Sequence, residues 1–402
     1  MYAAIDKSEL RGIINAIPSK SFAHRILICA ALCRQPTNIV GKLDSEDFMA
    51  TKGCLQKLGV KFEEVNDGYI ITPANKYNQN CMLDCGESGS TFRFLLPVIA
   101  GLGISATIEG QGRLAQRPMG ELIDVLRASG VSISNDVLPL CVSGNMTADI
   151  YVIRGDISSQ YISGLLLALP LLKRTAEIII TGERSSQSYI DITLDVMASF
   201  GVKINPTPTG YKIEAGQEYN SPKTIAIEGD WSNAACWLVA GALTGDITVT
   251  GLNVNSVQGD RYIVDILKNM GAIVYVADNS VRIIKSKLKC IEFDADNTPD
   301  LVPIVAVAAA CAEGVSVIKR VDRLRLKESD RLAAIIDMLK RLKIKAIHDG
   351  ALKIRGDKLT SAVLYGYNDH RLVMAGTIAA TVADNTIIMG IEAVKKSYPE
   401  FF

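Results

Sequence analysis

One phrase recurs along the chain: a helical pattern ends in glycine, and a strand pattern follows at once. It reads LQKLGVKF around Gly59, VLRASGVSI around Gly130, VMASFGVKI around Gly201 and ILKNMGAIV around Gly271, and a fifth copy, MLKRLKIKAI, has Lys343 in the glycine position. The spacing is 70 to 72 residues each time. Helix, glycine and strand follow one another in many proteins, but five copies at nearly one spacing indicate a structural repeat. We expect left-handed backbone at the repeated position, because glycine adopts it without strain.

Alignment on this phrase reveals the rest of the repeat. Each copy starts with a short strand and a polar loop, continues with an apolar helix such as GLLLALPLL and a strand such as EIIITG, and then has a second polar loop before the amphipathic helix. The six first loops are SKSFAHR (19–25), ESGSTFR (87–93), SSQYIS (158–163), DWSNAA (230–235), NTPDLV (297–302) and YNDHRL (367–372). The sequence therefore predicts an α/β protein of six β-α-β-α-β-β repeats, the sixth stopping before its second helix.

A chain of 402 residues exceeds what one ordinary core holds, so we expect two domains of three repeats each. The strands GIINAI (12–17) and KTIAIEG (223–229) occupy equivalent places three repeats apart and each leads into a polar loop. We interpret them as the two points where the chain crosses between domains. The predicted N-terminal domain is 19–228, and the predicted C-terminal domain is 1–18 together with 229–402.

Composition excludes several classes of protein. Lys+Arg and Asp+Glu both number 43, which argues against a general binder of nucleic acid or of a membrane surface. The start, MYAAIDKSEL, lacks the apolar stretch of a signal peptide, and apolar runs such as 301–312 are too short to span a bilayer. Nine cysteines without a CxxC pair indicate reduced thiols in a cytoplasmic protein, and three scattered histidines give no zinc pattern.

The polar loops carry the chemistry. All of them precede helices, whose free N–H groups and positive dipole end suit phosphate. In the first loop Ser19 and Ser21 can cap the helix or donate to an oxyanion, Lys20 adds a point charge, and Arg25 adds a planar clamp one turn later. Taken alone, the same residues could be capping serines and solvated cations on an ordinary helix.

Other loops strengthen the anion hypothesis, because the cations of a chain with no net charge gather in equivalent loops. These cations are Arg113 and Arg117, Arg323, Arg325, Lys327 and Arg331, Arg371, and Lys395 and Lys396. The segment LRLKESDRL could also be a salt-bridged helix start, with Glu328 paired to the next turn. No phosphate-binding glycine loop of the nucleotide type, no nucleophile elbow and no metal cage is present. The remaining chemistry is manipulation of phosphorylated substrates, with Lys and Arg for charge and Asp and Glu for protons.

Eight motifs together resemble the 5-enolpyruvylshikimate-3-phosphate synthase (3-phosphoshikimate 1-carboxyvinyltransferase) family of enolpyruvyl transferases. They are SKSFAHR, SGSTFR, QRPMG, SSQYISGLLLALP, YIDIT, PDLVP, KESDRL and YNDHRL, in this order along essentially the whole chain. The resemblance implies a two-domain inside-out α/β barrel, a monomer, and no metal or organic cofactor. It implies transfer of the enolpyruvyl group of phosphoenolpyruvate to the 5-hydroxyl of shikimate 3-phosphate, with release of phosphate, in the pathway to chorismate.

The resemblance also assigns residues. Contacts to shikimate 3-phosphate are implied for Lys20, Ser21, Arg25, Ser158, Ser159, Gln160, Ser186, Tyr189, Asp300, Arg323 and Lys327. Contacts to phosphoenolpyruvate are implied for Lys20, the Gly89 backbone, Arg117, Gln160, Arg331, Arg371 and Lys396. The implied catalytic residues are Asp300 as base for the 5-hydroxyl, Glu328 as the acid that protonates the methylene carbon and then removes that proton, and Lys20.

Two departures from the family pattern stand out, and two alternative functions stay open. Phe94 stands near Gly89 where many members of the family have proline. Gly89 has no side chain and so leaves room beside the phosphate, which favours sensitivity to phosphoenolpyruvate mimics such as glyphosate. Arg323 stands where some relatives have asparagine. A UDP-N-acetylglucosamine enolpyruvyl transferase shares the fold, but carries a cysteine in the loop that here reads GQGRLAQRPMG. A non-catalytic module for phosphorylated metabolites would need neither Asp300 nor Glu328.

Overall fold

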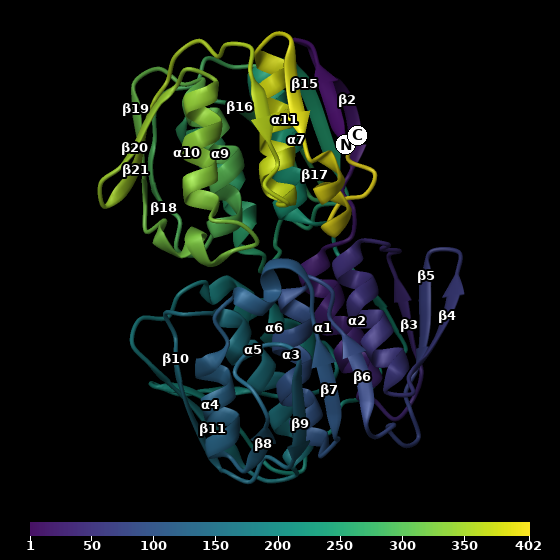
Figure 1. Ribbon diagram of the computed structural model, residues 1–402. Helices are drawn as coiled ribbons and strands as arrows, with labels where there is room; N and C mark the ends of the chain where they lie inside the picture. The colour runs from purple at the N-terminus through teal and green to yellow at the C-terminus, as the bar shows by residue number, and fades with distance from the viewer. The chain divides into compact units, whose positions relative to one another are not determined.

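The computed structural model describes all 402 residues, which divide into two compact units. We call Pro18–Ile227 the N-terminal unit, and Met1–Ile17 together with Glu228–Phe402 the C-terminal unit. Both units combine helices with several small sheets (Figure 1). No helix in either unit has both the length and the apolar character that a membrane crossing requires.

The N-terminal unit contains three four-stranded sheets. Their strand orders are β14 (Thr224–Ala226), β3 (Thr37–Val40), β5 (Gly68–Thr72), β4 (Lys61–Val65); β6 (Cys81–Asp84), β7 (Ala106–Glu109), β9 (Leu140–Gly144), β8 (Val131–Ile133); and β10 (Ile150–Arg154), β11 (Ala176–Thr181), β13 (Gly210–Ile213), β12 (Asn205–Pro206). The helices are α1 (Lys20–Ala31), α2 (Glu46–Lys57), α3 (Gly89–Leu102), α4 (Gly120–Ala128), α5 (Ser159–Ala168) and α6 (Gln187–Ser199), with 3-10 turns η1 (Gly112–Gln116) and η2 (Leu169–Leu172). Each sheet joins a parallel pair to an antiparallel hairpin.

The C-terminal unit repeats this plan. Its sheets are β2 (Arg11–Asn15), β15 (Asp246–Thr250), β17 (Ser280–Ile284), β16 (Ile273–Ala277); β18 (Glu292–Asp294), β19 (Val315–Lys319), β21 (Ala351–Arg355), β20 (Lys345–His348); and β22 (Val363–Tyr365), β23 (Thr386–Met389), β1 (Tyr2–Ile5). Its helices are α7 (Trp231–Thr244), α8 (Ile263–Asn269), α9 (Val302–Ala310), α10 (Arg331–Arg341) and α11 (His370–Val382), with 3-10 turns η3 (Gly259–Tyr262), η4 (Pro299–Leu301), η5 (Asp322–Leu326) and η6 (Ile391–Lys396). The six predicted β-α-β-α-β-β repeats are thus confirmed, the sixth lacking its own hairpin.

The strands next to the two crossings pair with partners far away in the sequence. β2 lies parallel to β15 in the C-terminal unit, although the chain continues from β2 into α1 of the N-terminal unit. β14 lies parallel to β3 in the N-terminal unit, although the chain continues from it into α7. The third sheet of the C-terminal unit is completed by β1, antiparallel to β23. Strand pairing therefore joins the beginning, middle and end of the chain.

The repeated position adopts left-handed backbone in every copy, as predicted. The φ angles are 100° at Gly59, 98° at Gly130, 79° at Gly201, 88° at Gly271 and 65° at Lys343. Each residue follows a helix and reverses the chain into the next strand or loop. Lys343 holds this conformation with a side chain, which strains the backbone where glycine would not.

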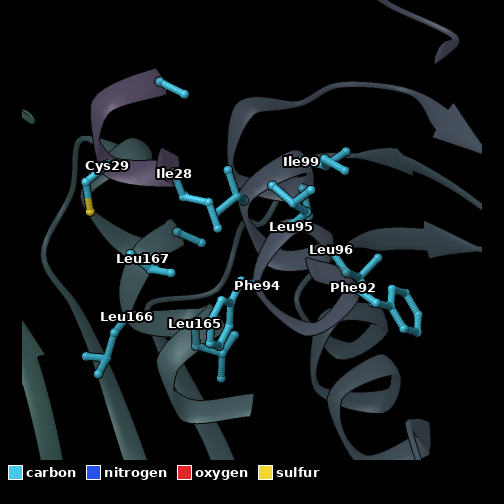
Figure 2. Packing of buried hydrophobic residues seen from close by; sticks show 14 of the residues in the cluster. Ile28, Cys29, Phe92, Phe94, Leu95, Leu96, Ile99, Leu165, Leu166 and Leu167 are labelled. Carbon is cyan, nitrogen blue, oxygen red and sulfur yellow. The ribbon is translucent and has the colours of Figure 1, made fainter. Parts of the chain in front are cut away.

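The apolar helices form the core, and the amphipathic helices lie outside them. In α3 nearly every residue from Gly89 to Ala100 is buried, as are most residues of α1 and α5. Figure 2 shows Phe94 and Leu95 of α3 packed among Ile28 of α1 and Leu165 of α5. Helices α7, α9 and α11 are buried in the same way in the C-terminal unit. A helix that is apolar on nearly all sides must be enclosed, and in α1 the charged side chains Lys20 and Arg25 lie in the first two turns.

Candidate active site

The first polar loops form the N-termini of the enclosed helices. Ser88 precedes α3 and accepts a hydrogen bond from the N–H of Thr91, and Ser158 precedes α5 and accepts one from the N–H of Gln160. Ser19 holds the same position before α1, but its side chain makes no such cap. Ser186 precedes α6 with a φ of 55°, a left-handed conformation rare for serine. The loops are therefore built as helix starts, the arrangement that suits an anion.

Arg25 is a buried cation whose hydrogen bonds go to neutral oxygens. Its guanidinium donates to the hydroxyl of Thr193 at 2.6 Å and to the carbonyls of Ser21 at 2.7 Å and Tyr189 at 2.8 Å. The ring of Phe94 lies 4.7 Å from its Cζ. Burial lowers the pKa of Arg25 to about 9. Because no carboxylate neutralises it, the positive charge is available to an anionic ligand.

Lys20 and Asp47 form an ion pair of 2.7 Å, with 14% of each side chain exposed. Lys20 begins α1 and Asp47 lies in the first turn of α2. The pair fixes the ammonium group beside the N-terminus of α1. Asp47 was not among the residues expected from the sequence, because nothing in its local pattern indicates which lysine it faces.

Gly89 lies against two arginines. A Cβ atom on Gly89 would come within 2.6 Å of Nη1 of Arg117 and 3.0 Å of Nη1 of Arg93. Arg93 donates to Oε1 of Gln160 at 2.6 Å, and Nε2 of Gln160 donates to Ser90 at 2.8 Å. The structure thus places Arg117 and Arg93 beside Gly89, and Arg93 connects this group to Gln160. The motif SGSTFR contains Arg93, so the signal for it was present in the sequence.

The residues expected to bind shikimate 3-phosphate in this unit occupy neighbouring helix starts. Ser158, Ser159 and Gln160 lie at the start of α5, and Ser186 and Tyr189 at the start of α6, which packs against α5 and α1. Arg25 connects α1 to α6 through the carbonyl of Tyr189. The side-chain oxygen of Ser158 already accepts a hydrogen bond from the N–H of Gln160 in its own helix, which the sequence could not show.

The C-terminal unit gathers carboxylates around one arginine. Arg331 donates to Asp300 at 2.7 Å, to Glu328 at 2.7 Å and to Asp369 at 2.7 Å. Lys327 donates to Asp300 at 3.1 Å. The contact between Glu328 and Arg331 is the salt-bridged helix start that the sequence allowed as an alternative, but Asp300 comes from the first loop of the same repeat and Asp369 from the next repeat. The cluster is therefore more than a local helix feature.

Charge determines the protonation of this cluster. Burial alone would raise the pKa of Asp300, but Lys327, Arg331 and Arg371 outweigh it and hold that pKa well below its usual value. Burial lowers the pKa of Lys327. Burial and the neighbouring Asp300 raise the pKa of Asp260 to about 7. Asp300 is thus ionised but weakly basic in the free site, and nearby anions would increase its basicity.

The remaining expected cations lie around this cluster or beside it. Arg371 is buried and donates to Oδ1 of Asn233 at 3.2 Å, and Lys396 is buried and donates to the carbonyl of Asn368 at 2.7 Å. Arg323 lies farther along η5, 3.7 Å from Asp296. Asp369, Asn233 and Asp260 were not expected, although YNDHRL and DWSNAA contain the first two. No group of three or more His, Cys, Asp or Glu side chains is arranged to hold a metal ion.

The fold and these two sets of residues define a class of protein: an α/β protein whose buried cations and carboxylates suit chemistry on anionic substrates. Within that class, the chain belongs to the EPSP synthase (3-phosphoshikimate 1-carboxyvinyltransferase) family, whose model matches residues 5–402.

Relatives of known name support the same family. The chain is 39% identical over 407 residues to a 3-phosphoshikimate 1-carboxyvinyltransferase of Clostridium kluyveri, covering 100% of this chain and 96% of the relative. It is 37% identical over 408 residues to one of Methanococcus maripaludis, covering 98% and 95%. The fold is that of EPSP synthase from Acinetobacter baumannii, with a TM-score of 0.83 at 24% identity and coverage of 100% and 96%. The enolpyruvyl transferase NikO from Streptomyces tendae has the same fold, with a TM-score of 0.79 at 17% identity and coverage of 98% and 94%. The predicted fold class is therefore confirmed.

Proposed function

We propose that this enzyme transfers the enolpyruvyl group of phosphoenolpyruvate to the 5-hydroxyl of shikimate 3-phosphate and releases phosphate. The observation that carries the proposal is that the two proposed proton-transfer residues, Asp300 and Glu328, both accept hydrogen bonds from the guanidinium of Arg331. Nη1 of Arg331 donates to Asp300 and its Nη2 donates to Glu328, each at 2.7 Å. A pair of carboxylates held beside cations suits an addition and elimination in which protons move at two different atoms.

In the addition step, Asp300 accepts the proton of the 5-hydroxyl while the hydroxyl oxygen bonds to C2 of phosphoenolpyruvate. Glu328 gives a proton to the methylene carbon, which becomes a methyl group. In the elimination step, Glu328 takes a proton back from this methyl group, the double bond forms again, and phosphate leaves with the proton that Asp300 accepted. Each residue thus acts on one proton, and both Asp300 and Glu328 return to their starting states.

Cations assist both steps. Lys327, Arg331 and Arg371 weaken Asp300 as a base in the free site, because they lower its pKa. Substrate anions beside these cations offset that effect and raise the proton affinity of Asp300. The same cations, with Lys20, stabilise negative charge on the departing phosphate.

The other assignments are those that the family resemblance implies. We assign Ser21, Arg25, Ser158, Ser159, Ser186 and Tyr189 to shikimate 3-phosphate, supported by the position of the serines at helix starts and by the unneutralised charge of Arg25. We assign Gly89, Arg117, Arg331, Arg371 and Lys396 to phosphoenolpyruvate, and Lys20 and Gln160 to both substrates. Arg323 and Lys327 complete the shikimate 3-phosphate set.

Phosphate release from phosphoenolpyruvate tests the proposal directly. We expect release only when shikimate 3-phosphate is present, and none when UDP-N-acetylglucosamine replaces it as acceptor. Release with the nucleotide sugar, or binding of both substrates without turnover, would contradict the proposed reaction.

Nine free cysteines favour a cytoplasmic location. Sedimentation would test the expected monomer.

A further inference from the structure

Four buried side chains form a chain of hydrogen bonds through the first three helices of the N-terminal unit. Nδ1 of His24 in α1 lies 2.7 Å from Oγ1 of Thr51 in α2, and this oxygen lies 2.6 Å from Oγ1 of Thr91 in α3. Thr91 in turn donates to Oγ of Ser88 at 2.7 Å. The exposed fraction of each residue is 2% or less. We call these four residues the hydroxyl relay.

The relay has one consistent direction. Burial, with Lys20 and Arg25 nearby, lowers the pKa of His24 well below its usual value, so the ring is neutral and carries one N–H. The hydroxyl hydrogen of Thr91 goes to Ser88 at 2.7 Å or to the more distant carbonyl of Asp47 at 3.5 Å, and in both cases Thr91 accepts from Thr51. Thr51 has then used its own hydrogen and accepts from Nδ1–H of His24. Nε2 of His24, buried without a hydrogen-bond partner, is then a lone pair, which is less costly to leave unpaired than an N–H group.

The relay ends at the first turn of α3. Ser88 caps this helix, Gly89 and Ser90 follow, and Ser90 accepts from Gln160. The other end connects to α1, because Thr51 lies one turn beyond Asp47, the partner of Lys20. One face of α2 therefore holds the start of α1 through Asp47 and the start of α3 through Thr51.

We propose that Thr51, together with His24 and Thr91, positions the first turn of α3 relative to Lys20 for binding of the phosphate of phosphoenolpyruvate. Thr51 is a positioning residue, since it acts through Thr91 and Ser88 on the Gly89 backbone. The proposal deepens the function proposed above and rests on it. It goes beyond that function in naming residues that contact neither substrate.

Thr51→Val tests the proposal, because valine keeps the shape of threonine and removes only the hydroxyl. We expect the KM for phosphoenolpyruvate to rise about 5- to 10-fold, the effect of losing roughly one hydrogen bond. The KM for shikimate 3-phosphate and kcat should each change less than about twofold. Thr51→Ser keeps the hydroxyl and should restore the KM for phosphoenolpyruvate. Unchanged constants in Thr51→Val, or equal losses in Thr51→Val and Thr51→Ser, would overturn the proposal.

Thr244→Val is the matched control. Thr244 is also a buried helical threonine, but its hydroxyl donates only to the carbonyl of Ala240 in its own helix. The control should leave the KM for both substrates unchanged. A rise in the KM for phosphoenolpyruvate as large as that of Thr51→Val would show a general loss of stability and would refute the positioning role.

The tautomer of His24 provides a readout that needs no activity. With only three histidines in the chain, ring ¹⁵N shifts of a histidine-labelled sample can be assigned. We expect hydrogen on Nδ1 and none on Nε2 of His24 at neutral pH. An Nε2–H ring or an imidazolium would overturn the relay even in a fully active enzyme. Conversely, the protein could show the expected tautomer of His24 but no enolpyruvyl transfer. That result would support the hydroxyl relay and refute the proposed function.

Discussion

Nε of Arg331 donates to Oδ2 of Asp369 across 2.7 Å, and the exposed fraction is 1% for the arginine side chain and 0% for the aspartate side chain. The same carboxylate accepts hydrogen bonds from the hydroxyl of Ser329 and from the N–H of Arg371. Asp369 therefore holds the arginine that contacts both proposed proton-transfer residues. It also caps α11, the helix that starts with His370 and Arg371.

Asp369→Asn should destabilise the protein strongly. The change leaves part of a buried positive charge uncompensated, and breaking a buried pair in this way costs about 3 to 5 kcal/mol. Urea unfolding measures the loss. Asp337→Asn is the control, because its pair with Arg341 is 34% and 38% exposed and should contribute at most about 1 kcal/mol. Equal losses in the two variants would show that burial of the Asp369 pair is unimportant.

Asp300→Asn and Glu328→Gln should each reduce kcat by about two to four powers of ten, the usual effect of a positioned acid or base. Binding of shikimate 3-phosphate, measured by calorimetry, should change far less. Asp322→Asn alters an exposed carboxylate in the neighbouring turn η5 and should keep full activity. Near-normal turnover in both active-site variants would refute the assignment of proton transfer.

Asp260 should make stability depend on pH. Its folded pKa of about 7 exceeds its ordinary value of 3.8, so the folded protein binds an additional proton between these pH values. Stability contributed by the protonated carboxyl is present below about pH 4 and is lost as the pH rises through 7. The charged groups around it are Asp300, Arg371 and Asp230, and Ser232 donates to it.

Asp260→Asn removes this titration. Relative to the unaltered protein, the variant should gain stability as the pH rises from 5 to 8, by at most about 3 kcal/mol, because the proton numbers of the folded and unfolded states differ over roughly the two pH units between 5 and 7. Urea unfolding at both pH values measures the difference. Parallel pH profiles for the two proteins would mean that Asp260 is not a protonated buried acid near neutrality.

Gly89→Ala should weaken binding of phosphoenolpyruvate. The added Cβ would lie 2.6 Å from Nη1 of Arg117, so this flexible side chain must move while the fold is retained. We expect the KM for phosphoenolpyruvate to rise about tenfold, corresponding to roughly 1.4 kcal/mol, and the KM for shikimate 3-phosphate to change little. Gly120→Ala adds a methyl group where no atom lies within 4 Å and should be neutral. An unchanged KM in Gly89→Ala would place the phosphate elsewhere.

Lys343→Gly should stabilise the protein. The residue holds a φ of 65°, and a left-handed L-residue with a side chain is strained by about 1 to 2 kcal/mol. Glycine removes that strain but adds freedom to the unfolded chain, which leaves a gain of about 0.5 to 1 kcal/mol. Gly271→Ala is the reverse test, because its Cβ would meet only the carbonyl oxygen of Lys287 at 3.8 Å and yet φ is 88°. Thermal unfolding should show opposite shifts, and shifts of the same sign would contradict the strain argument.

Local pattern alone determined the repeated architecture. Helix, left-handed residue and strand follow from side-chain periodicity and from the sterics of glycine, which operate within a few residues, and this is why even the fifth copy with Lys343 was identified. The position of the polar loops at helix starts is equally local. The motifs therefore predicted the family, and with it the candidate residues Arg25, Asp300 and Glu328.

Only the tertiary structure decided which of these residues meet. The pairing of β2 with β15 joins residues more than 230 positions apart, and Asp369 reaches Arg331 across 38 positions. Such contacts depend on how whole helices pack, because a side chain's pattern in the sequence does not specify its distant partner. Thr51 illustrates this limit: in the sequence it is one threonine of an amphipathic helix, and its hydrogen bonds to His24 and Thr91 exist only because α1, α2 and α3 are packed together.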